Sequence, residues 1–239
     1  FNNLTFTTAY LRGVMLESPV LNKKIDYTVF WGREGGGRYG NLSPGLGKIR
    51  DSFLSGMDFN YSPFLKQSYG FSVIHGWGRD RPTNLNPYNY DLYADAKVSD
   101  KQKLRYEIAN DSQKFAHLFT STYSVPKFHL TTEIRNIDKA FQTAIGSGYR
   151  HGQLGTLFYL FTTPTEKLNI TSRLDVYQDR LFPSSKSPNI WNEDFDWNAN
   201  YTIDPATSLM LNYTLQNELG RLGPFRYYSP GTGLNRTFD

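Results

Sequence analysis

Apolar and polar residues alternate with a period of two along most of the chain. In the stretch DFDWNANYTI, residues 194–203, the odd-numbered positions are aromatic or aliphatic and the even-numbered positions are Asp, Asn or Thr. The same alternation occurs in residues 90–98, 128–135, 167–176 and 208–218. Successive side chains of a strand point to opposite faces of a sheet, so this pattern predicts strands with one apolar and one polar face.

The alternation predicts about twelve strands and no helical period of comparable length. We expect the strands at residues 4–17, 24–34, 50–61, 67–78, 89–98, 102–110, 116–125, 127–136, 142–163, 166–179, 193–203 and 206–218. The span 142–163 is interpreted either as one long strand or as a hairpin that turns near 150–153. No linker interrupts the pattern, so the expected fold is all-β, with a single domain over residues 1–239.

The expected connections alternate in length. Short turns are predicted at 62–66, 99–101, 125–127, 164–167 and 204–206, and longer loops rich in Gly, Pro and Asn at 35–48, 80–89, 181–192 and 220–234. One edge of the sheet then carries the short turns and the other the long loops. If residues 18–23 also form a short turn, the first strand starts on the long-loop side and the chain ends there too.

The two faces of the predicted strands differ in composition. The polar positions carry charges of both signs, interpreted as lining an aqueous lumen: Arg50, Asp58, Asp91, Asp95, Lys97, Lys103, Arg105, Glu107, Glu133, Arg135, Arg173, Asp175, Asp194, Asp196 and Glu218. Such charges either bias the passage of solutes or form cross-strand ion pairs that satisfy a polar interior. The apolar positions near strand ends carry aromatic residues, expected at a lipid interface: Trp31, Phe59, Tyr61, Tyr69, Trp77, Tyr90, Trp197 and Tyr201.

Composition narrows the class of protein. The chain is 38% hydrophobic, whereas soluble globular domains are about 45–50% apolar, so a thick apolar core is not expected. Strands of about 10–12 residues exceed the usual five or six, which weighs against the alternative of a soluble sandwich, propeller or barrel. No apolar run reaches the length of a membrane-spanning helix. The net charge of +4 is dispersed, which argues against a nucleic-acid partner.

Candidate chemistry is sparse. The chain has no Cys, so disulfides and thiolate metal sites are excluded. The Gly-rich run 32–40 lacks the Gly-Lys-Ser/Thr sequence of a phosphate-binding loop and favours a plain loop. The four His residues lie on separate predicted strands, and only His75, close to Asp80, suggests a hydrolase site. We therefore assign no catalytic residue, metal or cofactor.

These features together resemble the bacterial outer-membrane β-barrels as a class. The resemblance covers essentially the whole chain and rests on strands such as DFDWNANYTI, aromatic residues near strand ends, short turns such as VPK, and Gly/Asn/Pro loops. It implies an antiparallel transmembrane β-barrel in the outer membrane, in contact with the lipid bilayer, lipopolysaccharide and other envelope proteins. Complete barrels usually begin and end in the periplasm, so the chain is interpreted as part of a larger barrel of about 14 or more strands.

The resemblance implies passage or anchoring at the outer membrane. The first hypothesis is a non-enzymatic pore or secretion conduit, because barrels of about 16 or more strands hold an aqueous channel. The second is a structural barrel with a plugged lumen that scaffolds a larger envelope complex. The third is an outer-membrane hydrolase that uses His75.

Overall fold

The computed structural model describes residues 4, 11–21, 24–34, 53–78, 88–144, 150, 152–180, 191–219 and 225–236. Within these residues the chain forms thirteen strands and no helix. The strands are β1 (Leu11–Val20), β2 (Ile25–Glu34), β3 (Phe53–Phe64), β4 (Gln67–Trp77), β5 (Tyr88–Lys97), β6 (Gln102–Asn110), β7 (Phe115–Val125), β8 (Phe128–Ile137), β9 (Gln153–Thr165), β10 (Leu168–Asp179), β11 (Trp191–Asp204), β12 (Thr207–Leu219) and β13 (Phe225–Arg236).

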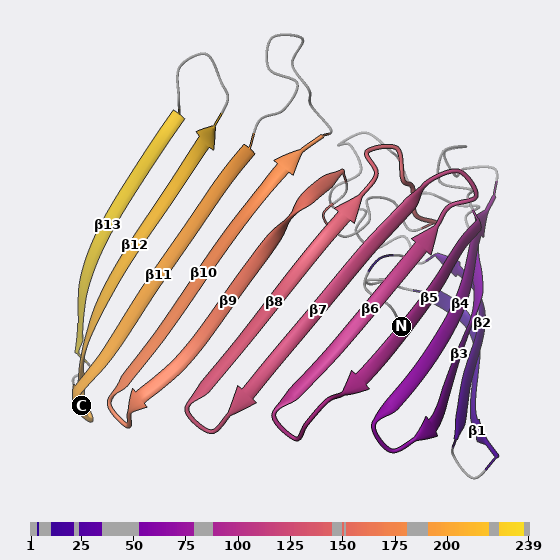
Figure 1. Cartoon of the computed structure of the whole chain (residues 1–239), viewed down its shortest axis with the longest axis horizontal. Coiled ribbons are helices and arrows are strands. Elements are labelled where there is room, and N and C mark those ends of the chain that lie inside the picture. Colours follow the sequence, from indigo (N-terminus) through magenta and orange to yellow (C-terminus); the bar gives the residue numbers. More distant parts are fainter. Residues whose placement is uncertain are drawn as a thin grey trace. The chain divides into compact units, whose positions relative to one another are not determined.

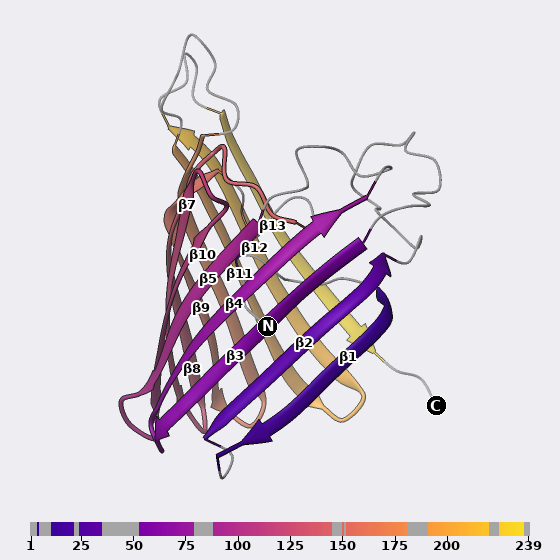
Figure 2. The same cartoon turned by 90° about the vertical axis from the view of Figure 1, so that its right-hand side faces the viewer.

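The strands form one sheet in which neighbours in sequence are neighbours in space, from β1 to β13. Figure 1 shows β8 to β13 side by side, and Figure 2 shows β1 to β4 in the same order. Neighbouring strands from β1 to β5 and from β8 to β13 pair antiparallel. The predicted all-β antiparallel sheet is therefore confirmed. Among the described residues β1 and β13 each have one neighbour, so the sheet is open.

Most strand boundaries lie within a few residues of the prediction, but three segments differ. The strand expected at 142–163 is wrong in its first half, because β9 begins at Gln153 and Phe141, Thr143 and Ala144 are buried in a connection. The loop expected at 220–234 overlaps most of β13, which returns the chain to the short-turn edge. The expectation that the chain ends on the long-loop side is therefore also wrong. The first strand begins at Leu11, while Leu4 lies in a turn.

The connections also depart from a strict alternation of short and long. Asn110–Phe115 is a tight connection on the edge of the sheet where the long connections lie. The Asp111 carboxylate closes it by accepting the backbone N–H groups of Gln113 and Lys114, at 2.9 and 2.6 Å. A carboxylate that accepts hydrogen bonds from the N–H groups two and three residues ahead stabilises a short turn. The connection at this edge therefore does not need to be long.

The sheet divides into two compact units. Unit 1 comprises residues 1–96, 105–118 and 137–152, and unit 2 comprises residues 97–104, 119–136 and 153–239. In each unit the registers place directly opposite residues on the same face. We call the face that carries Asp58 in unit 1 and Asp175 in unit 2 the polar face, and the opposite one the apolar face.

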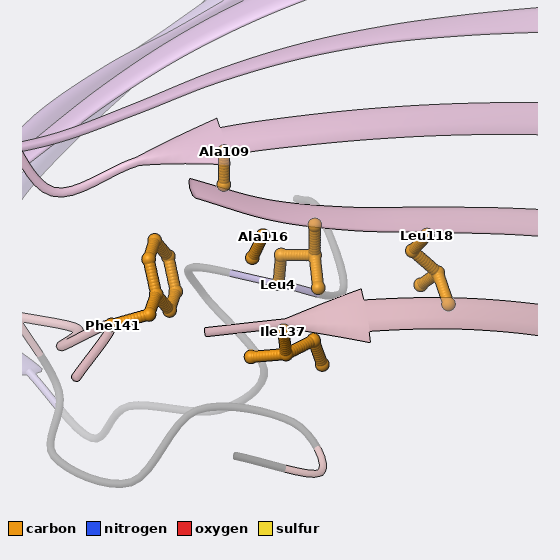
Figure 3. Packing of buried hydrophobic residues seen from close by; sticks show 6 residues of the cluster. All are labelled: Leu4, Ala109, Ala116, Leu118, Ile137 and Phe141. Carbon is orange, nitrogen blue, oxygen red and sulfur yellow. The ribbon is translucent and has the colours of Figure 1, made fainter. Parts of the chain in front are cut away.

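Apolar burial is concentrated in unit 1. One cluster consists of Leu4, Ala109, Ala116, Leu118, Ile137 and Phe141, and a second of Phe30, Leu54, Ile74 and Ala144. Figure 3 shows the first cluster, with Leu4 next to Ala116 and Ile137. The strand residues of both clusters share the parity of the polar face. Unit 1 therefore has a small hydrophobic core on the side of the sheet that alternation predicts to be polar.

Candidate functional site on the polar face

The structure places the predicted charged residues as follows. Unit 1 holds Asp58, Asp91, Asp95, Arg105 and Glu107, and unit 2 holds Lys97, Lys103, Glu133, Arg135, Arg173, Asp175, Asp194, Asp196 and Glu218. Arg50 lies outside the described residues. Register pairs such as Asp58–Ser72–Asp91 and Arg173–Asp196 show which of these residues share a face. Two separate networks, one in each unit, bring most of them together.

In unit 1 the network is centred on Arg105. Its guanidinium forms ion pairs with Asp95 at 3.0 Å and with the buried Glu107 at 3.3 Å. It also lies over the ring of Tyr93, 4.3 Å from the ring centroid, a cation–π geometry. The Tyr93 hydroxyl in turn donates to Asp58 at 3.3 Å. One cation thus organises residues from three strands, β3, β5 and β6.

Gly70 makes this reach sterically feasible. It lies directly opposite Tyr93 in the register, between Tyr93 on β5 and Asn60 on β3. A Cβ at Gly70 would overlap the Tyr93 ring. The missing side chain therefore lets the ring cross β4 and reach Asp58, two strands away, which a larger residue at position 70 would prevent.

The segment 138–144, which follows β8, covers part of the polar face of unit 1. Asn89, which is buried on β5, holds it with both ends of its amide: Nδ2 donates to the Gln142 carbonyl at 2.8 Å, and Oδ1 accepts the Ala144 N–H at 2.6 Å. Asp111 accepts the Gln142 N–H at 2.8 Å. Phe141 enters the first apolar cluster and Ala144 the second. The segment is thus fixed by backbone-directed hydrogen bonds and by apolar contacts.

Leu4 covers the polar face of unit 1 at a second place. It is 1% exposed within the first cluster, and its N–H donates to Oε1 of Glu107 at 2.6 Å. Burial of a carboxylate is costly unless hydrogen bonds and a cation compensate for the lost water, and Glu107 has Leu4 on one oxygen and Arg105 on the other. The hydrogen bond between Leu4 and Glu107 therefore connects the charged network of unit 1 to its first apolar cluster.

In unit 2 the network is built on Arg135, whose side chain is completely buried. It pairs with the equally buried Asp175 at 2.6 Å and with Glu133 at 3.5 Å, and donates to Gln153 at 3.0 Å. Arg173 continues the network from the second oxygen of Asp175 at 3.1 Å. An ion pair that is removed from water in this way is costly to break, because the remaining charge stays buried without its partner.

The edge of the unit 2 network extends over β11 and β12. Arg173 reaches Asp196 at 3.5 Å, and Asp196 accepts the Thr214 hydroxyl at 3.0 Å. The Tyr177 hydroxyl donates to Asp194 at 3.3 Å. These groups are half-exposed, in contrast to Arg135 and Asp175.

Unit 2 repeats the glycine arrangement of unit 1. Gly155 lies directly between Arg135 and Tyr177 in the register. A Cβ at Gly155 would lie 2.5 Å from the Val176 carbonyl oxygen and from Cβ of Tyr177. Arg135 therefore crosses β9 above a residue with no side chain and reaches Asp175 on β10. In both units a long side chain passes over a glycine to a carboxylate two strands away.

The eight predicted aromatic residues all lie on the apolar face: Trp31, Phe59, Tyr61, Tyr69, Trp77 and Tyr90 in unit 1, and Trp197 and Tyr201 in unit 2. In unit 1, Trp31, Trp77 and Tyr90 belong to a longer stacked row. Ring centroids are 5.9 Å apart for Trp31–Phe53 and Phe53–Trp77, and 3.8 Å apart for His75–Tyr88. His75 is thus part of an aromatic row on the apolar face. Asp80, its suggested catalytic partner, lies outside the described residues.

Sequence reasoning missed the residues that cover unit 1, namely Leu4, Asn89, Asp111 and Phe141. A signal for them was present. Phe30, Leu54, Ile74, Leu118 and Ile137 are apolar although they occupy the polar parity of their strands, and they gather where the long connections lie. Apolar residues on both faces of neighbouring strands indicate that another segment of the chain packs there.

Among the described residues no helix is both long and apolar enough to span a membrane. The same part of the chain contains no group of three or more His, Cys, Asp or Glu side chains that could hold a metal ion. No protein-family model matches the chain, and no curated protein matches it significantly.

Proposed function

We propose that this chain forms wall strands of a bacterial outer-membrane β-barrel that serves as a conduit for solutes. In this proposal the apolar face contacts lipid and the polar face lines a water-filled lumen. The barrel, its membrane and its transport activity are all parts of the proposal. The observation that carries it is the arrangement of aromatic and aliphatic residues on the apolar face of unit 1.

That face carries two aromatic levels with aliphatic residues between them. Phe53, at the start of β3, belongs to the stacked row described above. Tyr61, near the other end of β3, lies directly opposite Tyr69 and forms the second level. The eight steps from Phe53 to Tyr61 span about 27 Å along a strand, or about 20 Å across a membrane at the usual tilt of barrel strands. Between the levels lie the exposed Val29 and Met57. Outer-membrane barrels have an apolar band of about 25 Å flanked by aromatic girdles.

The ion pairs of the polar face also support the proposal. Buried ion pairs such as Arg135–Asp175 lie directly behind exposed aliphatic residues of the same strands, such as Ile134, which is 50% exposed. A soluble β-sheet protein would bury its aliphatic face and expose its charges. The reverse arrangement suits a wall between lipid and a hydrated interior.

One observation favours a second candidate, a structural barrel with a plugged lumen. Segment 138–144 and Leu4 pack on the polar face of unit 1, so that part of the proposed lumen is filled by the chain itself. A conduit requires that the rest of the interior stay open, whereas a scaffold does not.

Fluorescence quenching by lipids brominated at known depths tests the membrane part of the proposal. In a background with all four Trp replaced by Phe, we expect Met57→Trp to be quenched most by bromines deep in the bilayer. A Trp reintroduced at position 31 should be quenched most by bromines near the headgroups. Gln216→Trp, on the polar face of β12, is the matched control and should escape both. Equal quenching at positions 57 and 216 would refute the assignment of faces to lipid and water.

Conductance across planar bilayers separates the two candidates. A conduit predicts discrete, ohmic current steps for the folded chain. A stably inserted protein, shown by the quenching pattern, that passes no current would refute the conduit and support the scaffold.

A further inference from the structure

We propose that the half of the unit 2 polar face nearest the short turns is a binding surface for a neutral oligosaccharide. The surface consists of Tyr159, Phe161, Asn169, Thr171, Asn198, Asn200 and Asn212. The inference rests on the proposed function, because a water-filled lumen would make this surface accessible to a solute. Its own test does not require transport.

The polar face of unit 2 changes character along its strands. The register rows that contain Arg135 and Asp175 are charged. The row His129–Phe161–Thr171–Asn198–Asn212–Gly231 and the next row, Asn169–Asn200–Met210–Gly233, contain no Asp, Glu, Lys or Arg. A hydrated surface with no charged side chain over two rows favours neutral polar ligands over ions.

Two aromatic residues of β9 break the alternation at this place. Tyr159 and Phe161 lie on the polar face and remain 38% and 39% exposed. Within the described part of the chain neither ring stacks on another ring. On the apolar face, in contrast, His75 uses its ring face to stack on Tyr88. Free ring faces beside a hydrated surface can contact the C–H side of a sugar ring.

The amides supply the polar half of such a site. Asn198 lies directly opposite Asn212, and Asn169 directly opposite Asn200. Opposite side chains are about 4.5–5.5 Å apart, which is the span of one pyranose unit. Each amide offers two donors and an acceptor, which matches hydroxyl groups that both donate and accept.

These amides are also available. No hydrogen bond from the four side chains to another described residue is formed, and Asn212 is exposed. Gly231, directly opposite Asn212, leaves space for the Asn212 amide, because a Cβ at position 231 would lie 2.7 Å from Nδ2 of Asn212. By contrast, the amide of Asn89 in unit 1 is fully used in holding segment 138–144. The four unit 2 amides have the same chemistry but no hydrogen-bond partner among the residues that the structure describes.

Isothermal titration calorimetry of the folded chain in detergent, with maltohexaose as the probe, tests this proposal. We expect saturable binding that Phe161→Ala weakens about tenfold, the effect of losing one aromatic contact. Asn198→Ala should weaken it about three- to tenfold. The matched control is Phe158→Ala, which removes an exposed ring from the apolar face of the same strand and should leave the affinity unchanged.

A second probe tests the preference for neutral ligands. A galacturonate hexamer, which carries a carboxylate on each unit, should bind at least about tenfold more weakly, because neither of the two uncharged rows has a Lys or Arg to pair with these carboxylates. Equal affinity for both probes would overturn the proposal, as would equal losses for Phe161→Ala and Phe158→Ala. Conductance without maltohexaose binding would refute this inference and leave the conduit intact. Binding without conductance would support this inference and refute the conduit.

Discussion

Units 1 and 2 are built from the same kind of strand, yet their polar faces are stabilised in different ways. Unit 1 places apolar residues on this face and covers them with Leu4 and Phe141. Unit 2 buries a charged pair, Arg135–Asp175, and leaves its amides and two aromatic rings in contact with the surroundings. The difference shows that a polar parity in the sequence fixes which way a side chain points, but not what it meets there.

The largest loss of stability is expected from Arg135→Met in unit 2. The substitution leaves the buried Asp175 without its shortest ion pair, and we expect the free energy of unfolding to fall by about 3–5 kcal/mol. Arg173→Met is the control, because its side chain is 39% exposed and should cost at most about 1 kcal/mol. Urea titration of the chain refolded in lipid vesicles measures both. Similar losses for the two variants would mean that the buried Arg135–Asp175 pair contributes no more to stability than the half-exposed Arg173.

A smaller loss is expected from Phe141→Ala in unit 1. Removal of this buried ring leaves a cavity among Leu4, Ala116 and Ile137, at a cost of about 3 kcal/mol. Phe161→Ala removes the same side chain from the open polar face of unit 2 and should cost less than about 1 kcal/mol. The same urea titrations provide the comparison. If the two substitutions were equally costly, unit 1 would have no core of its own.

The smallest effects concern the glycines over which long side chains pass. Gly155→Ala brings a methyl group against backbone atoms that cannot move aside, and should cost about 1–3 kcal/mol. Gly70→Ala should cost less, because the group in its way is the Tyr93 ring, which can rotate. Gly233→Ala is the control, since its nearest neighbour would be Met210 at 3.9 Å. Thermal unfolding midpoints of the three variants should follow this order, and any other order would refute the crossing geometry.

The sequence predicts the strands well because burial of one face imposes the period of two. The strand expected at 102–110, for example, has the same bounds as β6. It fails at segment 138–144. Phe141 and Ala144 continue the apolar content of the following strand, so their burial in a connection cannot be told from a strand by local pattern alone. It also missed β13, whose Gly231 and Gly233 read as a loop, although Gly231 leaves room for Asn212 across the strand pair.

The structure brings most of the predicted charged residues into two networks, but the sequence does not predict which of them pair. The sequence does not show that Arg135 passes over Gly155, because register is a property of two strands. Tyr93 and Tyr177 were not selected at all, since a Tyr in an alternating strand suits either face. Only the pairing of Tyr93 with Gly70 reveals its role.

The strand count has a consequence for the barrel proposed above. With thirteen described antiparallel strands, β1 and β13 run in the same direction, from the long-connection edge to the short-turn edge. A seam made directly between them would therefore be parallel. A wall that is antiparallel throughout needs an odd number of additional strands between the two edges. Single-chain bacterial barrels have an even number of strands, and an odd number with a parallel seam is known from a mitochondrial barrel.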